Sequence, residues 1–109
     1  MANTFKLKTK ANVGGTTVGI YTAPAATTTV VIGITLSNTS GSGVNVGVGI
    51  TRAGTTEDVK LLKNAPIPQG SSLEFMGGNK VVLETTDTLT VDSDTNNSVD
   101  AALTIMEIT

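Results

Sequence analysis

The chain has 109 residues, a mass of 11.1 kDa and a formal net charge of −2. It contains no Cys and no His, so disulfide staples, thiolate chemistry and imidazole bases are all excluded within it. Aromatic residues make up 3% and hydrophobic residues 39%, so a single domain of this length needs a core of Val, Ile, Leu and Ala.

Residues 1–15 begin with a regular alternation of charge and apolar side chains. Lys6, Lys8 and Lys10 alternate with Phe5 and Leu7. Lysines on one face are typical of an exposed edge strand. We therefore expect a basic N-terminal arm or edge strand over residues 1–15, with its lysines facing outward and Phe5 and Leu7 packed on a sheet, followed by a β-sandwich domain over residues 16–109.

The stretch from 28 to 52 has the strongest strand pattern in the chain. Apolar residues at 30, 32, 34 and 36, and again at 44, 46, 48 and 50, recur with a period of two. We expect two central antiparallel strands joined by the polar turn 37–43, each with one aliphatic row. Gly47 and Gly49 would let another backbone or another subunit approach closely.

Short strand-like runs fill the rest of the chain. We expect strands over 4–10, 16–22, 71–76, 80–84, 88–92 and 98–108; residues 57–63 fit a strand or one helical turn, and a strand is favoured. Gly77-Gly78-Asn79 predicts a hairpin turn, and Pro66 and Pro68 predict a rigid connector over 64–70. The fold class is therefore all-β, a single antiparallel β-sandwich (jelly-roll or Ig-like) of about 8–9 short strands.

Charge is distributed unevenly along the chain. Lys6, Lys8, Lys10 and Arg52 precede residue 56, whereas all nine acids follow it. Copies of such a chain can attract one another, which favours a homo-oligomer. The predicted inter-subunit contact residues are Phe5, Lys6, Leu7, Lys8 and Lys10, with the lysines paired to a neighbour's acids such as Asp92, Asp94 or Glu107.

The strongest metal-like motif is Asp92, Asp94 and Asn96, which match the start of an EF-hand Ca²⁺ loop. The match then fails, because the sixth position is Asn97 where Gly is needed and the twelfth is Leu103 where Glu is needed. An ordinary Asp/Asn turn is the favoured interpretation, and no metal or cofactor is expected.

Other function classes have little support in the sequence. The run from Gly77 to Lys80 lacks phosphate-loop spacing, and no Ser or Thr sits in a nucleophile motif. Three lysines without interleaved aromatic residues are a weak footprint for nucleic acid. The alternation of charge and apolar residues at the start predicts no signal peptide, and no run approaches the apolar length of a membrane span. We expect no enzyme activity, no nucleic-acid partner and no membrane partner, and synthesis in a cytoplasm.

Several motifs carry a family resemblance. They are the Tyr-Thr-Ala-Pro-Ala start at 21–25, the Pro-Gln-Gly connector at 68–70, Lys-Val-Val-Leu-Glu at 80–84 and Asp-Thr-Leu at 87–89. With these motifs the sequence resembles small virion structural proteins of tailed bacteriophages, in which a compact β-sandwich decorates heads, necks or tails. The likeness covers most of residues 16–108 and leaves the lysine-bearing N-terminus outside.

The resemblance implies a non-enzymatic virion protein that is assembled in the host cytoplasm. A capsid decoration or cement protein, which self-associates and binds the major capsid protein lattice, is the function we expect. The alternatives are a neck or tail component, and a host-surface or glycan-binding module.

Overall fold

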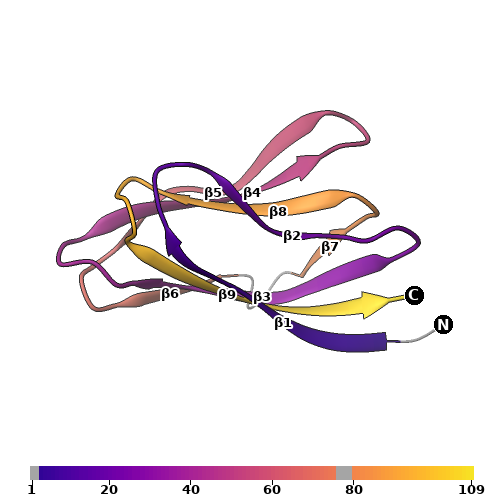
Figure 1. Ribbon diagram of the computed structural model, residues 1–109, viewed down its shortest axis with the longest axis horizontal. Coiled ribbons are helices and arrows are strands. Elements are labelled where there is room, and N and C mark those ends of the chain that lie inside the picture. The colour runs from indigo at the N-terminus through magenta and orange to yellow at the C-terminus, as the bar shows by residue number, and fades with distance from the viewer. Residues whose placement is uncertain (1–2, 76–79) are drawn as a thin grey trace.

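The computed structural model describes residues 3–75 and 80–109, which form two stacked antiparallel sheets (Figure 1). The nine strands in this described part are β1 (Asn3–Val13), β2 (Val18–Thr22), β3 (Thr28–Asn38), β4 (Val44–Arg52), β5 (Glu57–Ile67), β6 (Ser72–Phe75), β7 (Val81–Leu83), β8 (Asp87–Ser93) and β9 (Val99–Ile108). No helix in the described ranges is long and apolar enough to span a membrane. The predicted all-β sandwich is confirmed.

The strand order identifies a jelly roll. One sheet has the order β1-β9-β3-β6, with β7 also paired to β3, and the other has the order β2-β8-β4-β5. The first half of the chain thus pairs with the second half in reverse: β4 with β5, β3 with β6 and β7, β2 with β8, and β1 with β9. One long two-stranded ribbon rolled into a sandwich gives this pattern. Of the two predicted arrangements, jelly-roll and Ig-like, the fold is therefore the jelly roll.

Two predicted strand pairings are wrong. β3 and β4 are not partners, because the turn after Asn38 carries the chain from one sheet to the other. β6 and β7 do not form a hairpin, since both pair with β3, opposite residues 34–37 and 29–31 respectively, and continue one line along it. The turn predicted at Gly77-Gly78-Asn79 lies outside the described residues.

The core between the sheets is aliphatic, as the composition predicts. β9 buries Val99, Ala101, Leu103 and Ile105 on one face, and β4 buries Val44, Val46 and Val48. The predicted row on β3 is only half right. Ile32 is an extra residue that forms a β-bulge between Val31 and Gly33. Before the bulge the odd-numbered side chains face the core, and after it the even-numbered side chains do. Val31, Ile34 and Leu36 are buried, while Val30 and Ile32 remain half-exposed.

Gly47 and Gly49 permit a close approach within the chain itself. A methyl group at Gly47 would lie 2.7 Å from the Asp92 carboxylate, and one at Gly49 would lie 2.8 Å from the Val59 carbonyl oxygen of β5. β5 is an edge strand whose register shifts twice along β4, and it extends through Pro66 into the segment predicted to be a connector. The glycines therefore accommodate a neighbouring backbone of the same subunit.

Replacing a core residue by an acid should prevent folding. Ile34 and Val46 are 2% and 1% exposed, and an unpaired carboxylate there costs several kcal/mol, which is comparable to the stability of a small domain. We expect Ile34→Asp and Val46→Asp to give insoluble or unfolded protein by circular dichroism. Val82→Asp is the matched control, because Val82 is 54% exposed, and it should keep the β spectrum. Folded Ile34→Asp and Val46→Asp proteins would show that the core is misplaced.

Candidate interaction surface

The outward-facing side of the five-stranded sheet, here called the outer face, carries a continuous apolar row. Phe5 is opposite Met106, Met106 is opposite Val30, and Val30 is opposite Val82, so four adjacent strands contribute one residue each. Directly paired residues share a face of a sheet. Phe5 and Val82 are 68% and 54% exposed. The row therefore presents apolar surface to the outside of the sandwich.

A second row lies beside the first and contains a depression. It runs from Leu7 through Thr104 to Gly33, and Leu7 is 65% exposed. The depression, here called the Gly33 hollow, has a volume of about 280 Å³ and is lined by Ile32, Gly33, Ile34, Thr35, Glu74, Ala102 and Thr104. Projecting side chains on β1 and small side chains on β3 and β9 thus occur on the same face.

The predicted facing of β1 is reversed. Its alternation is as expected, but Lys6 and Lys8 pair with the buried residues Ile105 and Leu103, and so share the inner face, whereas Phe5 and Leu7 face outward. The physical reason is a buried acid: Lys6 Nζ lies 2.8 Å from Glu107 Oε1, and the Glu107 side chain is only 8% exposed. The acid predicted to bind a neighbouring copy is thus paired within its own chain.

Glu107 is held on both carboxylate oxygens. Its Oε2 accepts a 2.6 Å hydrogen bond from the Tyr21 hydroxyl, and Tyr21 Oη lies 2.8 Å from Thr29 Oγ1. Since Tyr21 has a single hydroxyl hydrogen, Thr29 donates to it. The Lys6 ammonium, followed by the Tyr21 hydroxyl, lowers the pKa of Glu107 below its usual value, while burial and the hydrogen bond to Glu107 raise the pKa of Tyr21 to about 12. This network ties β1 and β9 to β2 and β3.

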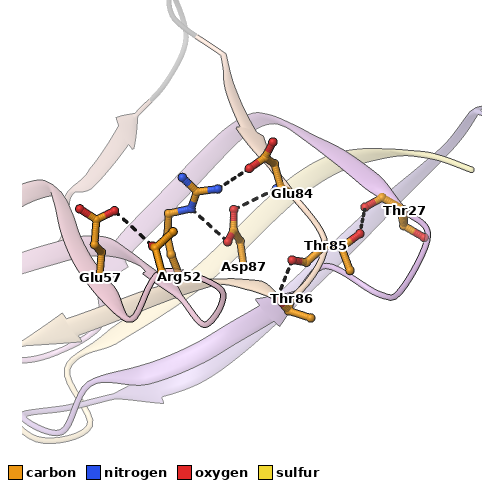
Figure 2. A network of polar contacts seen from close by, with 8 residues as sticks. Thr27, Arg52, Glu57, Glu84, Thr85, Thr86 and Asp87 are labelled. Atoms are coloured by element: carbon orange, nitrogen blue, oxygen red, sulfur yellow. Dashed lines mark hydrogen bonds and ion pairs between the residues drawn. The ribbon is translucent and has the colours of Figure 1, made fainter.

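A second polar network closes the end of the sandwich, where β4 meets the turn between β7 and β8. Arg52 Nε donates to Asp87 Oδ1 at 3.2 Å, and Arg52 also pairs with Glu84, while the Glu84 backbone N–H donates to Asp87 Oδ2 at 2.9 Å (Figure 2). Asp87 is buried, so its charge is balanced where it is least solvated. A cleft of about 450 Å³ beside it is lined by Ile50, Arg52, Val59, Val82, Glu84 and Asp87.

The three oxygen ligands proposed for Ca²⁺ are only partly brought together. Asp92 and Asp94 line one cleft of about 290 Å³, together with Lys60 and Lys63, but Asn96 does not line it. Asp92 Oδ2 accepts from Thr17 Oγ1 at 3.1 Å and lies 3.7 Å from Lys60 Nζ. In the described part of the chain, no group of three or more acidic side chains could hold a metal ion.

The remaining ligand atoms of this loop accept hydrogen bonds from backbone N–H groups of other segments. Asp94 Oδ1 accepts from the Asn45 backbone N–H at 3.1 Å, and Asn96 Oδ1 accepts from the Gly15 N–H at 3.4 Å. These bonds join the loop to the start of β4 and to the turn after β1.

Comparison with known proteins identifies structures with a similar fold but no family. No protein-family model and no curated protein matches the sequence. Among solved structures, a chain from the disulfide-linked pili of Bacillus endospore appendages matches with a TM-score of 0.57 at 15% identity, covering 99% of this chain and 87% of that one.

Two virus particles also contain similar chains. One is from the T13 particle of IBDV, with a TM-score of 0.59 and 14% identity over 96% of this chain, which spans only 30% of that chain. The other is from the acid-stable capsid of Helicobacter pylori bacteriophage KHP30, with a TM-score of 0.59 and 10% identity, covering 98% of this chain and 87% of that one. At such identities the likeness establishes the shared β-sandwich fold.

The outer-face row was not predicted from the sequence as a unit. Phe5 and Leu7 are among the predicted contact residues, but Val30, Met106 and Val82 are not, because the row exists only through the pairing of distant strands. The apolar residue at the outward position of β9, Met106 beside Glu107, is the one local signal that could have indicated it.

Glu107 should make the stability of the protein depend on acid pH. A carboxylate whose pKa is lowered on folding stabilises the native state at pH values above the pKa of the unfolded chain, which is about 4.5. That stabilisation is lost as the pH falls through the lowered pKa of the folded protein. We expect Glu107→Gln to be less stable than wild type at pH 7 in urea denaturation, and the difference to shrink below about pH 4. Glu57→Gln, at an exposed acid, is the control. A difference that does not change with pH would contradict this role of the ion pair.

Removing divalent metal should leave the protein unchanged. The oxygen atoms of Asp92, Asp94 and Asn96 already accept internal hydrogen bonds. We expect equal melting temperatures in excess Ca²⁺ and in excess chelator by differential scanning calorimetry. A clear rise with Ca²⁺ that Asp94→Asn abolishes would instead establish a calcium site in this loop.

Proposed function

We propose that the chain is a non-enzymatic virion structural protein: a capsid decoration or cement protein that self-associates and binds the major capsid protein lattice. The observation that carries the proposal is the outward-facing apolar row of Phe5, Met106, Val30 and Val82, in which Phe5 and Val82 are exposed and Met106 and Val30 are partly exposed. Contiguous apolar surface on a soluble domain marks a site of association. Phe5 and Leu7 act in this surface as direct contacts, and Lys6, Lys8 and Lys10 lie along its open edge.

The similar structures support an assembly role. Two of them come from virus or phage particles and one from a pilus, and in each case the named object is built from many subunits. A disulfide-linked polymer is not available to these 109 residues, which contain no Cys. Non-covalent contacts through sheet surfaces are therefore the means of assembly that we propose.

The charged side chains support a non-enzymatic role. Lys6 and Glu107, Arg52 and Asp87, and Lys60 and Asp92 are internal ion pairs that join strands. A catalytic base or acid usually faces a cleft with a substrate position beside it. Here the buried acids Glu107 and Asp87 are each paired with a cation on another strand of the same sheet, and these pairs join the strands.

A glycan-binding module is less well supported. Tyr21, the one aromatic residue with a polar tip, is 7% exposed, and its hydroxyl is used by Glu107 and Thr29. It cannot present its ring to a sugar without opening the network.

Quantitative mass spectrometry of purified particles tests the proposal. We expect the protein in the particle at a copy number of the same order as the major capsid protein, because a decoration protein occupies repeated lattice positions. A dozen copies or fewer would indicate a neck or tail component. Absence from particles, together with glycan-array binding by the isolated protein, would overturn the proposal in favour of a host-surface module.

A further inference from the structure

The outer face has projections and a depression that match one another. Leu7 and Phe5 project from β1, at the edge of the sheet, and the Gly33 hollow lies two strands away on β3. β9 runs between them. A surface that carries both a projection and a recess can bind a second copy of itself across a two-fold axis.

We propose that two copies of this chain pack outer face to outer face, with the two-fold axis parallel to β9 and above it. This inference rests on the proposed function only because both use the outer face. It adds that a second copy of the chain covers this face. Rotation about such an axis puts β1 of each copy over β3 of the other, and β9 over β9. Sheets in a sandwich pack in this aligned way, at about 10 Å and about 30°.

The register determines which residues then meet. Leu7, Thr104 and Gly33 lie at one level of the sheet, so Leu7 of each copy enters the Gly33 hollow of the other. Phe5, Met106 and Val30 lie at the next level, so Phe5 covers the partner's Val30. Thr104 and Met106 each lie near the axis and face their own equivalents. The apolar row is thereby covered by the same row of the second copy.

The charges at the other end of the face are complementary in this arrangement. Glu74 of β6 is opposite Thr35, Thr35 is opposite Ala102, and Ala102 is opposite Thr9, so all four share one level. In the rotated copy, β6 overhangs the open edge of β1 at this level, where Lys8 and Lys10 flank Thr9. The Lys10 side chain begins on the inner face, because Lys10 pairs with the buried Ala101, but Lys10 is exposed at the open edge of β1. A lysine side chain at an open edge is long enough to turn its ammonium around that edge toward Glu74 of the second copy.

The covered area is sufficient for a specific dimer. With strands about 4.8 Å apart and about 3.3 Å per residue, overlap of the three long strands and the overhanging edge buries roughly 600 Å² per copy. The total of about 1,200 Å² is the lower limit for specific interfaces. The dimer should therefore be reversible in dilute solution.

Analytical ultracentrifugation of the full chain tests the face. We expect a concentration-dependent monomer–dimer equilibrium that Leu7→Asp weakens at least about tenfold in Kd, because the substitution puts a carboxylate into an apolar recess. Val59→Asp is the matched control, since Val59 is 40% exposed on β5 of the other sheet. The dimer Kd of this variant should equal that of wild type. Circular dichroism checks that both variants are folded. A monomer at every concentration, or a dimer that Leu7→Asp leaves intact, overturns the inference.

A charge exchange tests the orientation of the two copies. Glu74→Lys and Lys10→Glu should each weaken the dimer, and the double variant should recover most of the loss. Glu74 and Lys10 lie three strand positions apart in one subunit, about 14 Å across the sheet, so rescue has to come from the partner. Additive losses in the double variant would overturn the proposed axis.

Cross-linking gives a second measure of the axis. The chain contains no Cys, so Thr104→Cys introduces a single thiol near the axis, and a short bismaleimide should link two copies efficiently. Val59→Cys is the control and should link poorly. If Thr104→Cys fails to link while Val59→Cys links, the dimer uses the other sheet.

The two proposals fail in distinguishable ways. A solution dimer of a protein that is absent from particles refutes only the virion role. A solution monomer whose Leu7→Asp variant no longer binds particles refutes only the dimer, and indicates that the capsid lattice covers this face.

Discussion

The ion pair between Lys6 and Glu107 is the interaction on which the outer face depends. It brings a lysine of the edge strand against a carboxylate that is buried between the sheets, and so determines which side of β1 faces outward. A buried carboxylate without a partner would be strongly unfavourable, and Lys6 and Tyr21 together satisfy both of its oxygens. Once Lys6 faces inward, the alternation of the strand requires that Phe5 and Leu7 face outward. The exposed apolar row is the consequence of a polar contact on the opposite side of the sheet.

The inward lysines also restrict the kind of contact that β1 can make. An edge strand of eleven residues is a ready template for pairing with another strand, and inward-pointing charges are one device that prevents it. If two β1 strands paired antiparallel around Leu7, Lys6 of one would lie opposite Lys8 of the other, and like charges in that position are destabilising. Lys6, Lys8 and Lys10 therefore disfavour association through the edge, whereas the uncharged rows of Phe5 and Leu7 favour association through the face.

Local patterns predicted the strands but not their partners. The runs at 44–52 and 98–108 have a strict period of two, and their buried rows were predicted correctly because nothing interrupts the alternation. On β3 the same reasoning failed at Ile32, since a bulge is set by the register of β9 and not by the sequence around it. Adjacent strands were expected to form hairpins, yet β3 and β4 lie in different sheets, because a jelly roll pairs strands from opposite halves of the chain. The facing of β1 depended on Glu107, about a hundred residues away, and no local window contains that information.

The composition of the outer face fits weak, repeated contact better than tight binding by one copy. Its two central rows consist of uncharged side chains, Phe5, Met106, Val30 and Val82 in one and Leu7, Thr104 and Gly33 in the other, so covering them removes no charge from water. A pair of such faces alone gives only a reversible complex. When the same contact is repeated among copies that a lattice already holds close together, the effective concentration is high and each further contact adds to the whole. In the proposed role, such a subunit would stay separate while it is dilute and adhere once it is arrayed, because neighbouring contacts would then act together.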